Sequence, residues 1–253
     1  MDRRKRVLIT GAAGLVGGVL REALADNYTL STLDIKHLAG DHLEADMTDF
    51  EKIFPVFEGK DIVIDLAAHA PSSTPWPQIH ENNLPATYNV YEASLKAGVQ
   101  RVIFASSNHV TGLYEEDKPY VDIVNGKYDG LDPKKIPLIN TQMPIRPDGA
   151  YGIAKAFGEA TGRFFSDRHG VSSICLRIGS LTGSGRPEGV RNFATLLTHR
   201  DLVQLVEKSI ETEVEPQFNV FYGVSDNTWR FWDIGNAIDH IGYNPQDDAE
   251  KWR

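Results

Sequence analysis

The chain has 253 residues, of which 41% are hydrophobic and 24% charged, which suits one α/β domain with a small appendage. Its formal net charge of −9 argues against nucleic-acid binding, which requires a basic surface, and no apolar run is long enough to span a membrane. The single cysteine, Cys175, excludes an internal disulfide and fits a reducing compartment, so we expect a cytoplasmic protein.

Short apolar runs alternate with helical patterns along most of the chain. The predicted strands are residues 7–9, 28–33, a short run near 43, 62–64, 102–104, 173–177 and 218–222. The predicted helices are residues 15–25, a short helix capped by Thr48, 77–97, 150–169, 202–210 and 234–241. Alternation at this short spacing predicts βαβ units and therefore a doubly wound parallel sheet with helices on both faces.

One stretch, residues 114–149, interrupts this alternation and is rich in Pro, Asp, Lys and Gly. A structureless stretch of this length is uncommon in a compact domain unless it has a function. We therefore expect a loop or lid over a ligand site.

Three glycines, Gly11, Gly14 and Gly17, stand between the first predicted strand and the first predicted helix. Glycines at these places allow a tight turn, close backbone approach to a pyrophosphate and close packing of helix on strand. The first helical residues, Leu15 and Val16, then offer free N–H groups and a partial positive charge to phosphates. The sequence therefore predicts a dinucleotide-binding turn.

Asp34 ends the second predicted strand. A carboxylate at this place accepts hydrogen bonds from the adenosine ribose hydroxyls and repels a 2′-phosphate. We therefore predict NAD rather than NADP, with Ile35 also in the cofactor site. Lys36 is the nearest cation, and a solvated strand-end carboxylate is the alternative interpretation of Asp34.

Tyr151 and Lys155 stand four residues apart at the start of a predicted helix, so their side chains share one face. A tyrosine is a poor base at neutral pH unless a neighbouring ammonium stabilises its phenolate. Ser107 ends the fifth predicted strand, at the sheet edge where open α/β sheets bind ligands. These three residues form a candidate catalytic group in which Ser107 holds a substrate oxygen and Tyr151 takes its proton.

Together these residues resemble the extended short-chain dehydrogenases, also called the NAD-dependent epimerase/dehydratase family. The matching positions are residues 10–17, Asp34, Asp46, Met47, Leu66, Ala67, Ala68, Asn83, Ser107 and residues 151–155. The resemblance implies a Rossmann sheet with a small C-terminal substrate-binding portion. It implies that residues 1–180 form the NAD-binding domain, with the loop 114–149 over the site, and that residues 181–253 form a substrate-side subdomain.

The resemblance also implies individual roles in cofactor binding. Asp46 and Met47 would flank the adenine, while Ala67 and Ala68, next to Leu66, would line the pyrophosphate and the nicotinamide ribose. Lys155 and Tyr151 would contact the nicotinamide ribose. The resemblance adds Asn83 and Ile178 to the cofactor site.

Within the superfamily, the chain is similar to uronate dehydrogenases and to archaeal-type NAD-dependent glucose-6-phosphate dehydrogenases. The stretches concerned are residues 104–109, 146–149, 177–180 and 242–247. The resemblance implies that Ser107, Asn108, His109 and Ser180 contact a sugar and that Arg191 pairs with its carboxylate. Two departures leave the sugar open: Ala70 stands where the uronate enzymes have a serine, and the stretch 114–149 is longer here.

The predicted function is therefore NAD-dependent oxidation of a sugar, first of all a uronate, at its C1 hydroxyl to a lactone. Glucose 6-phosphate or another aldose is the alternative substrate, and Arg186 would then share a phosphate with Arg191. A nucleotide-sugar epimerase or dehydratase and a non-catalytic NAD-binding protein are the rival functions. We expect no metal site, no nucleic-acid or membrane partner, and a homo-oligomer.

Overall fold

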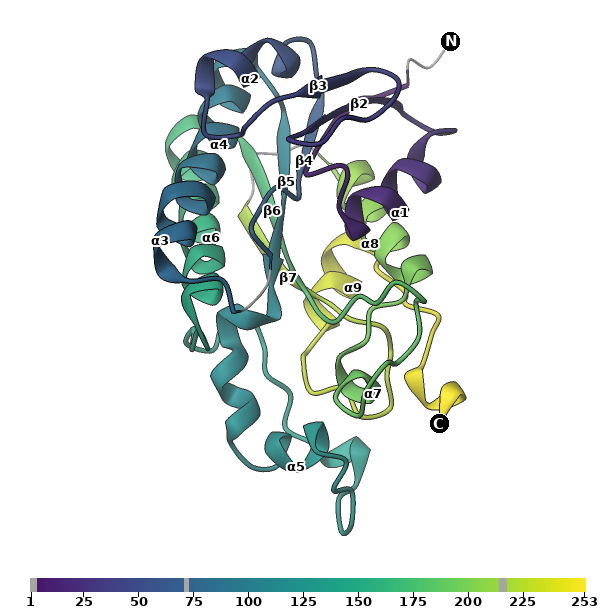
Figure 1. Ribbon diagram of the computed structural model, residues 1–253. Coiled ribbons are helices and arrows are strands. Elements are labelled where there is room, and N and C mark those ends of the chain that lie inside the picture. The colour runs from purple at the N-terminus through teal and green to yellow at the C-terminus, as the bar shows by residue number, and fades with distance from the viewer. Residues whose placement is uncertain (1–3, 71–72, 214–217) are drawn as a thin grey trace.

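The computed structural model describes residues 4–70, 73–213 and 218–253. Within them, a seven-stranded sheet has the order β3-β2-β1-β4-β5-β6-β7, and all neighbouring strands are parallel (Figure 1). The strands are β1 (Arg6–Thr10), β2 (Thr29–Asp34), β3 (His42–Glu44), β4 (Ile62–Asp65), β5 (Arg101–Ser107), β6 (Ser172–Ile178) and β7 (Phe218–Gly223). The predicted fold class is confirmed, and each strand begins within one residue of its predicted place.

Helices cover both faces of this sheet (Figure 1). One face holds α2 (Phe50–Phe57), α4 (Leu84–Ala97) and α6 (Ala150–His169), and the other holds α1 (Leu15–Leu24), α8 (His199–Glu211) and α9 (Gly235–Ile241). Successive side chains of a strand point to opposite faces, so Val7 and Ile9 join one apolar core and Leu8 joins the other. None of the helices in the described ranges is long and apolar enough to cross a membrane.

Two helix starts differ from prediction. The long helix predicted at 77–97 begins as α3 (Trp76–Gln78) and a π-helical turn (Ile79–Asn83) before α4, and ends at Gly98 as predicted. The predicted cap Thr48 is wrong, because its hydroxyl donates to Asp46 and the Asp49 carboxylate instead accepts from the backbone of Lys52.

The stretch 114–149 is not structureless, so that expectation is wrong. It holds the end of a 3₁₀ helix (Asn108–Glu116), then α5 (Tyr120–Val124) and a second 3₁₀ turn (Pro133–Lys135). Tyr120, Ile123 and Ile139 are buried, and Ile139 exchanges backbone hydrogen bonds with Phe231 and Asp233. These apolar side chains pack the stretch against the last part of the chain. The stretch lies beyond one end of the sheet (Figure 1).

The segment after residue 180 contributes to the sheet as well as to the region beside it. Its strand β7 pairs with β6 over six residues, and its helix α8 packs beside α1. A short helix, α7 (Asn192–Thr195), lies beyond the sheet and contacts α5.

Candidate active site

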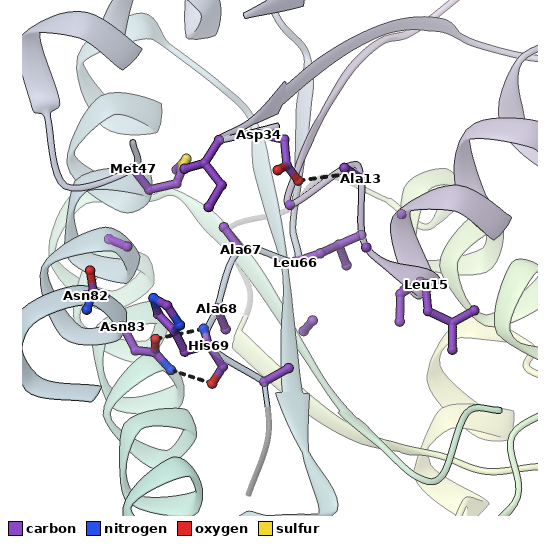
Figure 2. A pocket seen from close by; sticks show the side chains of 18 of the residues that line it. Ala13, Leu15, Asp34, Met47, Leu66, Ala67, Ala68, His69, Asn82 and Asn83 are labelled. Atoms are coloured by element: carbon purple, nitrogen blue, oxygen red, sulfur yellow. Dashed lines mark hydrogen bonds between the residues drawn. The ribbon is translucent and has the colours of Figure 1, made fainter. Parts of the chain in front are cut away.

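A cavity of about 590 Å³ opens at the carboxyl ends of β1, β2 and β4 (Figure 2). Of the predicted cofactor residues, those lining it are Gly11, Gly14, Leu15, Val16, Gly17, Asp34, Ile35, Asp46, Met47, Leu66, Ala67, Ala68, Asn83 and Ile178. Lining residues outside the predicted cofactor set include Lys36, His69, Ala70, Asn82, Ala105 and Gly179. His69 directly follows Ala67 and Ala68, which were predicted to line the cofactor site. This position in the sequence was the signal that could have identified His69 as a lining residue.

The glycine turn fits the pyrophosphate of a dinucleotide. Gly11 has φ +63°, and a Cβ there would lie 2.7 Å from the backbone carbon of Leu66, so the turn can lie directly against the end of β4. Gly14 begins α1 without a side-chain cap, and the first turn holds no acidic residue. The first N–H groups of α1 are therefore available to an anion in the cavity.

Two carboxylates lie at the other end of this cavity. Asp34 accepts a hydrogen bond from the backbone N–H of Ala13 at 2.9 Å (Figure 2) and another from the N–H of Lys36 at 2.9 Å. These bonds fix its orientation and leave lone pairs for a ligand. The backbone N–H and the hydroxyl of Thr48 both donate to Asp46, which lowers the pKa of that carboxyl. This end of the cavity is therefore anionic and suits ribose hydroxyls better than a further phosphate.

Asn83 holds the backbone that follows β4. Its side-chain oxygen accepts from the N–H of His69 at 2.9 Å, and its amide nitrogen donates to the His69 carbonyl at 3.3 Å (Figure 2). Both polar ends of the Asn83 side chain are thus used to shape the cavity wall.

The three catalytic candidates lie next to this cavity rather than among its lining residues. Ser107 ends β5 opposite Ile178 of β6, and its hydroxyl contacts the side chain of Asn108 at 3.2 Å. Tyr151 is in the first turn of α6, and the Lys155 ammonium lies 5.5 Å from the centre of its ring. Among the described residues, neither the Tyr151 hydroxyl nor the Lys155 ammonium has a hydrogen-bond partner, so both remain available to ligands.

Asp65, which the sequence did not single out, lies behind this group at the end of β4. It is fully buried, and one carboxylate oxygen accepts from the Thr10 hydroxyl at 2.6 Å. Burial raises the pKa of this carboxyl, and the Thr10 hydroxyl and the positive charge of Lys155 offset only part of that effect.

His109 is held by Asp148, another residue that the sequence did not single out. Their Nδ1 and Oδ2 atoms lie 2.6 Å apart, and the imidazole meets the Tyr151 ring edge-on with 5.8 Å between centres. A Cβ at Gly112 would lie 2.0 Å from the Asp148 carboxylate, so glycine leaves room for this contact. Asn108 beside His109 is buried, and its Nδ2 has no partner among the described residues.

Arg191 is already paired within the chain. Its Nε and Nη2 donate to the two carboxylate oxygens of Glu115 at 2.6 and 2.7 Å, and its Nη1 donates to the Ser180 hydroxyl at 2.8 Å. Arg186 is exposed, and its side chain has no partner among the described residues. Glu115 was missed because it lies 76 residues from Arg191, in the stretch predicted to be structureless.

Among known proteins, the chain is similar to sugar dehydrogenases. The family described as the NAD dependent epimerase/dehydratase family matches residues 7–204. Uronate dehydrogenase of Pseudomonas putida is 35% identical over 98% of this chain and 86% of its own. Two proteins of Haloferax volcanii are each 33% identical: NAD-dependent glucose-6-phosphate dehydrogenase, over 97% of this chain and 95% of its own, and L-arabinose 1-dehydrogenase (NAD(P)(+)), over 96% and 97%.

A solved structure of a uronate dehydrogenase is similar to this chain as well. A mutant of uronate dehydrogenase from Agrobacterium tumefaciens, complexed with NAD, is 32% identical and superposes with a TM-score of 0.82. The superposition covers 98% of this chain and 87% of that one.

Proposed function

The chain belongs to the NAD-dependent epimerase/dehydratase family, and we propose that it is a dehydrogenase that oxidises a cyclic sugar at its C1 hydroxyl with NAD. The observation on which this rests is the group of Ser107, Tyr151 and Lys155 beside a cavity built around a glycine turn. The relatives of this chain include dehydrogenases of three kinds of sugar. NAD is present in the solved structure of the uronate dehydrogenase mutant that this chain resembles.

The residues of the cavity fit NAD. The uncapped start of α1 would hold the pyrophosphate, and Asp34 would accept the adenosine ribose hydroxyls. The Lys155 ammonium, which has no described hydrogen-bond partner, would hold the hydroxyls of the second ribose. Bound NAD supplies the hydride acceptor of the reaction.

The side chains beside the cavity supply positioning and proton transfer. The Ser107 hydroxyl would hold the C1 oxygen of the sugar, and the Tyr151 phenolate would remove its proton. Lys155 stabilises that phenolate through its charge. Loss of this proton and of the hydride from C1 leaves a C1 carbonyl within the ring, which is a lactone.

Elimination or epimerisation of a nucleotide sugar is less well supported. A dehydratase of this superfamily would have an acidic pair after the catalytic serine, but Asn108 and His109 stand there. In our proposal, some residues within 108–149 and within 181–253 build the sugar side of the site.

The test is the appearance of NADH absorbance when purified protein is mixed with NAD and a panel of glucuronate, galacturonate, glucose 6-phosphate and free aldoses. We expect turnover with at least one sugar and accumulation of its lactone or acid. If no sugar in the panel reduces NAD, the proposed function is wrong.

We further propose a homo-oligomer that works in the cytoplasm, where its buried single thiol would stay reduced. Light scattering after size exclusion measures the oligomeric state, and a monomer at working concentrations would contradict the proposal.

A further inference from the structure

We propose that Glu115 is a specificity-determining residue that makes the site favour neutral aldoses over uronates. This inference rests on the proposed function, because it concerns which sugar reaches the C1-oxidising group. It departs from the sequence-based expectation of a uronate, in which Arg191 would meet the sugar carboxylate.

The Arg191 guanidinium is already occupied on the edge that suits a carboxylate. A guanidinium has five N–H donors, and its Nε and Nη2 edge matches the two oxygens of a carboxylate. Glu115 occupies this edge in a two-point contact, and Ser180 accepts from Nη1. Nη1 also donates to the Thr195 hydroxyl at 3.5 Å, so one N–H group of Nη2 remains and can donate to a sugar hydroxyl.

The net charge of the ion pair also disfavours a second anion. Arg191 and Glu115 together are neutral, and the Glu115 side chain is only 14% exposed, compared with 35% for Arg191. A uronate would bring a second carboxylate to a cation that one buried carboxylate already neutralises. Like charges brought together at a poorly solvated site oppose binding, whereas a neutral sugar meets no such repulsion.

The pair lies where the sugar is expected. Glu115 belongs to the 3₁₀ helix that begins at Asn108, directly after Ser107. Ser180, which accepts from Arg191, lies two residues beyond the end of β6, and that strand end pairs with Ser107. The ion pair therefore joins the two segments that leave the sheet beside the catalytic serine.

The experiment compares sugars that differ only at C6: galacturonate with galactose, and glucuronate with glucose, at saturating NAD. We expect the wild type to have the higher kcat/KM for the neutral member of each pair. Glu115→Gln keeps the size of the side chain but removes its charge, and should shift the ratio toward the uronate by about tenfold or more, mainly through KM.

Two further variants separate this effect from folding and from general charge. Glu116→Gln removes the same charge at an exposed neighbouring position and should leave the ratio unchanged. Glu115→Asp keeps the charge and should retain the preference for neutral sugars. Melting temperatures of all variants report whether each is folded.

Several outcomes would overturn the inference while leaving the proposed function standing. One is a wild type that prefers the uronates, and another is an equal shift in Glu115→Gln and Glu116→Gln. A wild-type preference for glucose 6-phosphate over glucose would do the same, because a phosphate brings more negative charge. Absence of turnover with every sugar would instead contradict the proposed function itself.

Discussion

Tyr151 and Lys155 lie one helical turn apart on α6, and the charge of the lysine acts on a tyrosine that is largely enclosed. The base and the activator that we propose thus come from one rigid element, which fixes their separation.

Tyr151→Phe keeps the ring and its edge-on contact with His109 but removes the proton acceptor. We expect turnover to fall by about a hundredfold or more while NAD affinity changes little. Steady-state kinetics and calorimetric titration with NAD measure the two effects. Tyr88→Phe, at an exposed tyrosine, is the matched control, and near-normal turnover of the Tyr151 variant would exclude Tyr151 as the base.

Asp34→Asn should relax the preference for NAD. The amide keeps an oxygen for the N–H of Ala13 but no longer repels a 2′-phosphate, and Lys36 lines the same cavity. We expect the ratio of kcat/KM for NAD to that for NADP to fall roughly tenfold. Asp26→Asn, at an exposed site, should leave this ratio unchanged. A wild type that already prefers NADP would show that Asp34 does not select the cofactor.

Side-chain pairs at the site were the part that the sequence could not predict. The cofactor positions follow from local rules, such as a glycine turn after a strand and an acid at the end of the next strand. Glu115 with Arg191 and His109 with Asp148 join residues far apart in the chain, and one sequence contains no signal that such residues meet. The sequence therefore singled out Arg191 and His109 as candidates but contained no signal of the partners that orient them.

At the level of elements, α1 contains two adjacent glycines in different surroundings. A Cβ at Gly17 would lie 2.6 Å from the Ala12 carbonyl oxygen, whereas one at Gly18 would meet nothing within 4 Å. Only Gly17 is needed for the close approach of the helix to its preceding turn.

We therefore expect opposite effects of alanine at these two positions. Gly17→Ala should lower the free energy of unfolding by about 1–3 kcal/mol through overpacking and should weaken NAD binding. Gly18→Ala should raise it by about 0.5–1 kcal/mol, because alanine is the better helix former. Urea unfolding followed by circular dichroism measures both changes, and equal effects would contradict the role of Gly17.

Most elements were predictable because their signals are local. Buried parallel strands are short apolar runs, and α4 and α6 end at Gly98 and Gly170, both with positive φ. The π-helical turn before α4 was missed, although Pro85 has no N–H to donate to the preceding turn and so disfavours a regular helix there. The folding of residues 114–149 depends on packing against residues near 231, which local patterns do not show.

Across the whole molecule, one buried ion pair joins helix and sheet. Glu159 of α6 forms two hydrogen bonds of 2.8 Å with Arg177 of β6 and accepts from Ser106 of β5. Arg177 also donates to the Tyr222 hydroxyl of β7. The side chains of Glu159 and Arg177 are 9% and 3% exposed, so water cannot replace either partner.

Glu159→Gln should therefore destabilise the fold strongly, by about 3–5 kcal/mol, because it leaves the buried Arg177 charge uncompensated. Asp167→Asn breaks the Arg163–Asp167 pair on the same helix, where the side chains are 60% and 56% exposed, and should cost less than about 1 kcal/mol. Guanidinium unfolding of both variants measures the difference. Similar losses would show that burial does not set the strength of these pairs.

The long connection of residues 114–149 has a consequence for the evolution of this fold. Most of the cofactor cavity is built from residues 11–86, whereas Glu115, Asp148 and Arg191 come from later stretches that pack on one another beyond the sheet. In our proposal those stretches build the sugar side of the site, so substitutions in them can alter the sugar without disturbing the cavity that holds the nucleotide. Lineages on this scaffold can therefore diverge in their sugar while keeping one glycine turn.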